Sequence, residues 1–240
     1  MSGSTRSNAF LSIARPYVRR TLANELDGVL VHGLESTIAH ARARPLVIAT
    51  THVSFWDPLL VFALDQALPG EGRALMDAAN LARLPFFGRV GAIPLDRSDR
   101  QRALADLDSA AAMLDAPEKR VWIFPQGRQR PTHLRPLGLR PGVLRLVAAS
   151  GAAVVPVALT YAFRECPRPA CLVSFGEPIE PSALAEGGLD TLEWALLREL
   201  AVIDNAHEAR SDDGFVTLVA SRVPRPDDSI ATKWLARLVR

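Results

Sequence analysis

Residues 45–60 have the sequence PLVIATTHVSFWDPLL, which changes character twice. The apolar, partly β-branched run from Leu46 to Ala49 is typical of a buried strand. A second apolar run begins at Pro58, and its length and the proline at its first position favour a helix. The polar residues between the two runs therefore lie at the carboxyl end of a strand. A strand that leads through a short turn into a helix predicts an α/β domain.

The rest of the chain repeats this alternation of strand and helix patterns. We expect strands at residues 28–32, 46–49, 91–95, 120–124 and 171–175, and another that begins at residue 153. We expect helices at residues 9–26, 34–43, 58–68, 100–114 and 189–206, and another that begins at residue 142. Residues 74–82 fit either a strand or a short helix, and residues 85–88 fit a turn. The pattern predicts a single α/β domain with a mixed, largely parallel sheet flanked by helices.

The two ends of the chain differ from this central domain, which we place at residues 28–210. Residues 1–27 form a basic segment with a partly amphipathic helical pattern. Residues 211–240 begin with a polar turn and end in an amphipathic helix that starts at Asp228. Helices of this kind either lie on a membrane interface or dock on the protein body, and the sequence leaves both interpretations open.

The composition indicates an ordinary globular protein. The length of 240 residues fits one domain with small additions, and the shares of 48% apolar and 22% charged residues exclude a disordered or coiled-coil chain. The net charge of +2 gives no strong field toward anionic partners. The chain also lacks a basic run interleaved with aromatic residues, so we expect no nucleic-acid partner.

The cysteines and the apolar stretches bear on where the protein works. Cys166 and Cys171 are too few for a disulfide framework and lack the further ligands of a zinc site, so we expect reduced thiols and no metal. The first residues lack the apolar core of a signal peptide. Pro156 interrupts the charge-free stretch 146–163, which favours a helix followed by a buried strand over a membrane span. We expect a soluble or surface-bound chain.

His52 and Asp57 form the first candidate site, at the edge of the sheet where open α/β proteins bind ligands. Residues five apart on a regular helix point about 140° away from each other, so the pair meets only if residues 52–56 form a turn. A histidine held by a carboxylate at one ring nitrogen can accept a proton at the other. The pair is a candidate general base, although a packed His52 beside a helix-capping Asp57 fits equally well.

Two further strand ends carry groups that suit an anion. Residues 120–124 lead into the turn Phe124-Pro-Gln-Gly127, where the Gly127 amide and the following Arg128 can bind negative charge. Residues 91–95 lead in the same way to Arg97. Each arginine alone is more often a solvated surface group. Three strand ends that present one base and two anion-binding groups nevertheless indicate a single site.

Taken in order, these segments resemble the four sequence blocks of the glycerolipid acyltransferase family, which includes lysophosphatidate (1-acylglycerol-3-phosphate) acyltransferases. Residues 51–57 resemble the first block, which carries a His and an Asp, and residues 91–97 resemble the second, which ends in an arginine for the acceptor phosphate. Residues 124–128 resemble the third block, Phe-Pro-Glu-Gly-Thr-Arg, and residues 155–157 resemble the fourth. The resemblance covers roughly residues 31–175.

The resemblance implies an acyltransferase in which His52 deprotonates an acceptor hydroxyl and Asp57 orients the imidazole. It implies that Arg97 and Arg128 hold the acceptor phosphate, with further substrate contacts from Thr51, Ser54, Phe124, Pro125, Gln126 and Gly127. The donor would be acyl-CoA or acyl carrier protein, and the acceptor a lysolipid such as 1-acylglycerol-3-phosphate. The enzyme would serve phospholipid biosynthesis as a peripheral or monotopic protein on the cytoplasmic face of a membrane, without a metal or a further cofactor.

Two departures from the family blocks concern the acceptor. Thr51 stands where the family usually has Asn, and Gln126 and Arg128 stand where it has Glu and Thr. An acyltransferase acting on an amino lipid or a glycosylated lipid therefore stays open, as does a non-catalytic lipid-binding relative, against which the intact His52 and Asp57 argue. The chain lacks a Gly-x-Ser-x-Gly elbow and a cysteine in the blocks, so we expect direct acyl transfer without a covalent enzyme intermediate.

Overall fold

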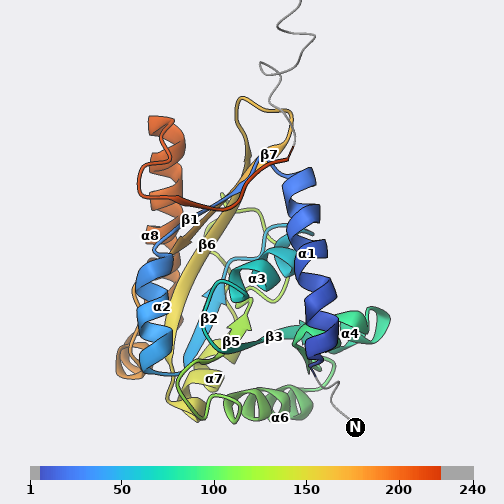
Figure 1. Ribbon diagram of the computed structural model, residues 1–240. Coiled ribbons are helices and arrows are strands. Elements are labelled where there is room, and N and C mark those ends of the chain that lie inside the picture. Colours follow the sequence, from blue (N-terminus) through green and yellow to red (C-terminus); the bar gives the residue numbers. More distant parts are fainter. Residues whose placement is uncertain (1–5, 223–240) are drawn as a thin grey trace, which may run out of the picture.

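In the computed structural model, which describes residues 6–222, eight strands pair into one sheet (Figure 1). In chain order the strands are β1 (Val29–His32), β2 (Leu46–Thr50), β3 (Glu71–Asp77), β4 (Ala92–Leu95), β5 (Lys119–Ile123), β6 (Ala153–Phe163), β7 (Pro169–Phe175) and β8 (Val216–Val219). Their order across the sheet is β4-β3-β5-β2-β6-β7-β1-β8. The β6/β7 and β1/β8 pairs are antiparallel and the others parallel. The predicted α/β class with a mixed, largely parallel sheet is confirmed.

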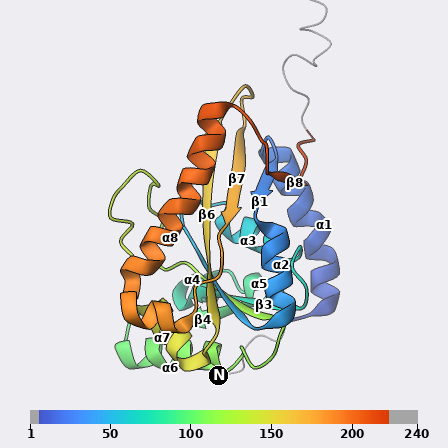
Figure 2. The same ribbon diagram turned by 90° about the vertical axis from the view of Figure 1, so that its left-hand side faces the viewer.

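Helices cover both faces of the sheet, and each face has its own apolar cluster. One cluster takes buried side chains from α1 (Asn8–Glu25), α2 (Leu34–Ala43) and α3 (Asp57–Asp65). The other takes them from α6 (Arg100–Ala111), α7 (Gly142–Ser150) and α8 (Pro181–Ala209). Figure 1 shows α1 and α8 on opposite sides of the sheet, and Figure 2 shows α8 running along it. Two short helices, α4 (Ala78–Arg83) and α5 (Phe86–Val90), connect β3 to β4 along the chain.

The continuous apolar run at residues 46–49, which precedes His52, is explained by the position of β2 inside the sheet. Leu46 and Ile48 are buried in the cluster with α1 and α3, whereas Val47 and Ala49 are buried in the opposite one. A strand covered on both faces needs apolar side chains at every position, not only at alternate ones. Burial of each large aliphatic side chain contributes roughly 1.5–3 kcal/mol, so β2 is a rigid base for the turn that follows it.

The amino-terminal helix α1 packs on the body of the protein. Its buried side chains, Leu11, Ala14, Val18 and Leu22, recur at three- and four-residue intervals and join the cluster around α3. Ile13 and Tyr17 lie on its exposed face. Across residues 6–222, no helix combines the length and the apolar character that crossing a bilayer requires. The helix expected from Asp228 falls outside the described residues.

The stretch 74–82 contains both of the elements that the sequence left open. β3 ends at Asp77, and α4 begins directly after it because the Asp77 carboxylate accepts the backbone N–H groups of Ala79 and Asn80. The turn expected at residues 85–88 is instead the entry to α5. The Asp77 cap therefore starts one short helix, α4, and a second short helix, α5, stands where we expected a turn.

Two differences lie near the carboxyl end. α8 begins at Pro181 rather than at residue 189, and Gly188 interrupts it with a positive φ of 59°. Residues 181–187 lead into the glycine pair Gly187-Gly188, which the sequence presents as a break and not as the interior of a helix. β8 was not expected, because only Val219 of its four residues is buried and the alternation of a strand is missing. Pairing with the edge of β1 supplies the hydrogen bonds that hold it.

Candidate active site

The parallel strands bring the predicted site segments to one edge of the sheet. His52 follows β2, and Phe124 follows β5, which is hydrogen-bonded to β2. Arg97 follows β4, and Asp77 is the last residue of β3. Because the carboxyl ends of parallel strands meet at the same edge, segments that lie far apart in the sequence converge here.

His52 and Asp57 are in direct contact. Nδ1 of His52 lies 2.6 Å from Oδ2 of Asp57, which also accepts the backbone N–H groups of Val53 at 2.7 Å and Ser54 at 2.9 Å. The other oxygen, Oδ1, accepts the hydroxyl of Tyr161 at 2.9 Å. Asp57 is 0% exposed, and these donors compensate the cost of burying a carboxylate. A carboxylate only accepts, so Nδ1 of His52 carries the proton and Nε2 has a free lone pair.

The sequence left open that Asp57 caps α3, but its carboxylate does not do so. Asp57 is the first residue of α3, Trp56 precedes it as the cap, and the side chain turns back to the amides of residues 53 and 54. This backward turn places residues five apart in contact, as the sequence required for a working pair. Pro58 follows at the start of the helix, where its missing N–H is tolerated.

The turn after β5 holds His52 from three sides. The backbone N–H of His52 donates to Oε1 of Gln126 at 2.7 Å, and its carbonyl accepts the N–H of Arg130 at 2.8 Å. The imidazole stacks on the ring of Phe124, with 4.3 Å between the ring centroids. The His52 side chain keeps 18% exposure. Among the described residues no hydrogen bond reaches Nε2, so this nitrogen is available to a substrate.

Gln126 connects the turns of the site through both ends of its amide. While Oε1 accepts from His52, Nε2 donates to the carbonyl of Leu137 at 3.2 Å, and the residue is only 2% exposed. A glutamate at this position could accept from His52, but it has no N–H to offer Leu137. The glutamine that replaces the usual family Glu therefore makes a hydrogen bond to Leu137 that a glutamate carboxylate cannot make.

Arg97 is engaged by two neighbours at the same edge. Its Nε and Nη2 donate to Oδ2 of Asp77 at 3.1 and 2.7 Å, and its Nη1 donates to the carbonyl of Gly127. The hydrogen bond from Arg97 is the main cause that lowers the pKa of Asp77 below its ordinary value. The Arg97 side chain is 39% exposed. It therefore presents a fixed guanidinium with remaining N–H groups at the surface beside Gly127.

Gly127 is at the centre of the predicted anion-binding turn. Its φ of 67° lies in the left-handed region, and a Cβ there would come within 2.9 Å of Cδ of Arg140 and 3.1 Å of Nη1 of Arg97. The neighbouring Pro125 is buried, and its carbonyl accepts the backbone N–H of Arg140 at 2.8 Å. Arg128 is exposed, and within residues 6–222 it makes no hydrogen bond or ion pair. Its predicted role in holding a phosphate stays a prediction.

Thr51 and Ser54 lie beside the pair, but their side chains bond to the protein backbone. The Thr51 hydroxyl accepts the N–H of Leu159 at 3.0 Å and donates to its carbonyl at 3.4 Å, which ties β2 to β6. Oγ of Ser54 accepts the N–H of Trp56 at 3.2 Å. Both contacts shape the turn around His52, and contact of either residue with a substrate stays a prediction.

Two residues of the site escaped the sequence analysis. Tyr161 bonds to Asp57 from 104 positions away, and nothing in the surrounding apolar strand pattern distinguishes it. Asp77 carries a usable signal, since it is a carboxylate at the end of a strand like the other site residues. The undecided assignment of residues 74–82 hid that strand end.

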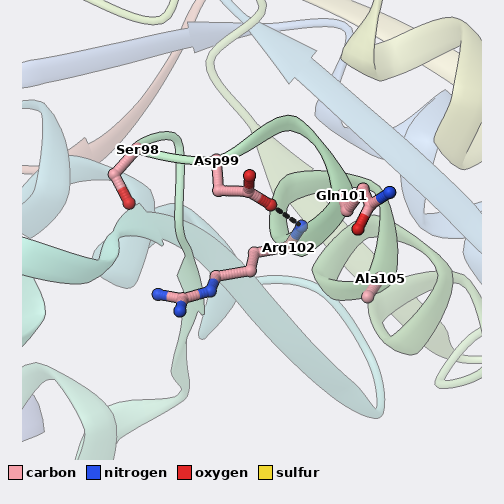
Figure 3. A pocket seen from close by; sticks show the side chains of 5 residues that line it. All are labelled: Ser98, Asp99, Gln101, Arg102 and Ala105. Atoms are coloured by element: carbon pink, nitrogen blue, oxygen red, sulfur yellow. Dashed lines mark hydrogen bonds between the residues drawn. The ribbon is translucent and has the colours of Figure 1, made fainter.

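A shallow surface hollow lies at the start of α6, next in the sequence to Arg97 (Figure 3). It is lined by Ser98, Asp99, Gln101, Arg102 and Ala105. Asp99 caps the helix here by accepting the N–H of Arg102 at 2.9 Å, as Figure 3 shows. None of these side chains contacts His52 or Asp57, and the cap accounts for the arrangement. We therefore place the candidate active site at His52 and not at this hollow.

An α/β sheet that presents a carboxylate-held histidine and arginine-lined turns at its carboxyl edge defines an enzyme-like site. Residues 28–160 match the family model described as Acyltransferase, and the chain belongs to that family. The chain is also 27% identical over 122 residues to a 1-acyl-sn-glycerol-3-phosphate acyltransferase of Saccharomyces cerevisiae. That alignment covers 49% of this chain and 39% of the yeast protein, so the chain spans well under half of the relative's length.

Proposed function

We propose that the protein transfers a fatty acyl group from a thioester donor to the hydroxyl of a lysophospholipid such as 1-acylglycerol-3-phosphate, in phospholipid biosynthesis. The observation that carries this proposal is the bond between His52 and the buried Asp57, which leaves Nε2 of His52 free as a base. The membership of the acyltransferase family and the likeness to the yeast relative support the same reaction.

The reaction then proceeds in one direct transfer. Nε2 of His52 takes the proton of the acceptor hydroxyl as the oxygen attacks the carbonyl carbon of the thioester. The tetrahedral intermediate collapses, the carbon–sulfur bond breaks, and the thiolate receives the proton back from the His52 imidazolium. Asp57 keeps the proton on Nδ1 and stabilises the imidazolium, so both proton transfers use the same nitrogen.

The acceptor phosphate is assigned to Arg97 and Arg128. Arg97 is held in place by Asp77 and the Gly127 carbonyl, and Arg128 follows Gly127 directly without a carboxylate partner in the described part of the chain. Charge-assisted hydrogen bonds from two guanidinium groups suit a phosphate dianion. Thr51, Ser54, Phe124, Pro125, Gln126 and Gly127 complete the proposed substrate-binding set through the turns that they build around His52.

The donor is proposed to be acyl-CoA or acyl carrier protein, both of which are strongly anionic. Exposed arginines continue along the loop after Gly127, at Arg135 and Arg140. The enzyme is proposed to rest on the cytoplasmic face of a membrane as a peripheral protein. The exposed Ile13 on α1 and the exposed Phe55 beside the site offer apolar contacts for such a surface.

The direct test is to incubate the purified chain with a lipid extract and isotope-labelled acyl-CoA or acyl carrier protein, and to identify the labelled product by mass spectrometry. Labelled phosphatidate is the expected product. A labelled amino lipid or glycosylated lipid would keep the acyl transfer but replace the acceptor. Absence of any labelled lipid would contradict the proposed function, provided that the labelled thioester and the lipids of the extract are still intact after the incubation.

A further inference from the structure

Tyr161 lies against the buried side of the His52–Asp57 pair. It belongs to β6, opposite Cys171 of β7, and its hydroxyl is 2.9 Å from Oδ1 of Asp57. The three other donors to this carboxylate, from His52, Val53 and Ser54, all bond to Oδ2. In the described chain Tyr161 is thus the single donor to the second oxygen.

The hydroxyl of Tyr161 must donate this hydrogen bond. Burial raises the pKa of Tyr161 far above its ordinary value, and the neighbouring Cys171 and Asp57 raise it further. The pKa of the Cys171 thiol is also raised, chiefly by complete burial and then by Asp57. Both groups therefore stay protonated and neutral, and the carboxylate is the acceptor.

We propose that Tyr161 is a positioning residue of the acyl-transfer site, which fixes the rotation of the Asp57 carboxylate and weakens its pull on the proton of His52. The effect of Tyr161 on catalysis rests on the proposed function. Besides the His52 imidazole, the groups that face the carboxylate are the amides of Val53 and Ser54 from the turn, Tyr161 from β6 and Cys171 from β7. Of the two side chains from the strands, Tyr161 bonds to the carboxylate.

Two effects follow from this arrangement. A hydrogen bond to the anionic carboxylate favours the deprotonated pair, so its loss makes the pair hold a proton more strongly. The acid limb of the kcat/KM profile should then move to higher pH. A carboxylate that can rotate also holds the imidazole less firmly, so kcat should fall by about two- to tenfold, the effect of one ordinary hydrogen bond, with little change in either KM.

The first variant is Tyr161→Phe, and the matched control is Tyr17→Phe, which removes the same hydroxyl from the exposed face of α1. In Tyr161→Phe the acid limb should move to higher pH, and the proton resonance of His52 Nδ1–H should move downfield as the less compensated carboxylate strengthens its bond. The control should change neither. The resonance needs no substrate, so it tests the inference even if no acyl transfer is found.

A second substitution avoids any loss of packing. The chain has only two tyrosines, Tyr17 and Tyr161. Expression of the Tyr17→Phe protein with 3-fluorotyrosine in place of tyrosine therefore introduces the fluorinated residue at position 161 alone. The fluorinated phenol is a stronger donor, and the acid limb and the resonance should both move in the opposite direction. In an Asp57→Asn background, Tyr161→Phe should have no further effect on kcat. An acid limb and a resonance that stay unchanged in both Tyr161 proteins would overturn the inference and leave the proposed function intact.

Discussion

Gln126 and His52 join two turns of the site through one hydrogen bond, from the backbone N–H of His52 to Oε1 of Gln126 at 2.7 Å. The turn that carries the proposed base is therefore attached to the turn that carries the proposed anion-binding residues. The opposite end of the same amide reaches Leu137. One side chain thus fixes the relative position of three backbone segments.

Gln126→Glu tests this linkage. The substitution removes the donor to the Leu137 carbonyl and places a carboxylate in a position that is 2% exposed. The free energy of unfolding should fall by about 1–3 kcal/mol, the cost of leaving a buried polar group unpaired. Gln129→Glu, at an exposed position of the same loop, is the control and should change stability little. Equal stability of the two proteins in denaturant titrations would show that the Leu137 bond contributes nothing.

Gly127→Ala tests the close approach of Arg97 and Arg140 to the backbone of Gly127. Gly127 and Gly151 share a φ of 67°, but a Cβ at Gly151 meets nothing within 4 Å, whereas at Gly127 it meets Arg140 and Arg97. Both alanine proteins should lose about 1 kcal/mol from the left-handed conformation. Only Gly127→Ala should also raise the KM for the acceptor, because it displaces Arg97. Comparable acceptor KM values in the two proteins would argue against a role for this turn in binding.

Arg97→Ala and Arg128→Ala separate the acceptor from the donor. Loss of one charge-assisted contact typically removes about 1.5–3 kcal/mol, so the KM of an acceptor held by that arginine should rise by roughly ten- to a hundredfold. Arg→Lys should restore only part of the binding, because an ammonium lacks the bidentate fork. Arg42→Ala, at an exposed position of α2, is the control. A rise in the thioester KM for Arg128→Ala would move that residue to the donor, and no change for either substrate would remove both arginines from the site.

Asp57→Asn tests the role of the carboxylate. An asparagine keeps the size of the side chain, but it can present its NH₂ group to His52 and so favours the wrong tautomer. Most activity should be lost. Stability should also fall, because Oδ2 organises the turn through Val53 and Ser54. Activity assays and thermal unfolding of the same preparation distinguish the two effects, and full turnover would show that Asp57 serves only the turn.

The alternation of strands and helices and the convergence of three strand ends could be predicted from the sequence, because both depend on local patterns and on a general property of parallel sheets. The pairing of His52 with Asp57 was also accessible, since only a turn lets residues five apart meet. Tyr161 and Gln126 were different. Their partners are set by the order of β5, β2 and β6 in the sheet, and no local pattern specifies which side chain of a buried strand will reach a carboxylate.

β8 and the early start of α8 show a second limit. Four residues with one buried side chain give no periodic signal, and β8 forms because β1 has an unpaired edge. The first part of α8 precedes a glycine with positive φ, which the sequence presents as an end rather than as an interruption. Both elements depend on contacts made by the folded domain.

The most direct test of the account compares wild-type protein with His52→Ala in acyl transfer from labelled acyl-CoA to 1-acylglycerol-3-phosphate, with thiol release and labelled lipid measured together. Removal of a general base should reduce turnover by about 10²–10⁴-fold. The circular dichroism spectrum should stay unchanged, because the His52 ring is partly exposed and stacks only on Phe124. A folded His52→Ala protein that forms labelled phosphatidate at the wild-type rate would contradict the central claim that His52 is the base.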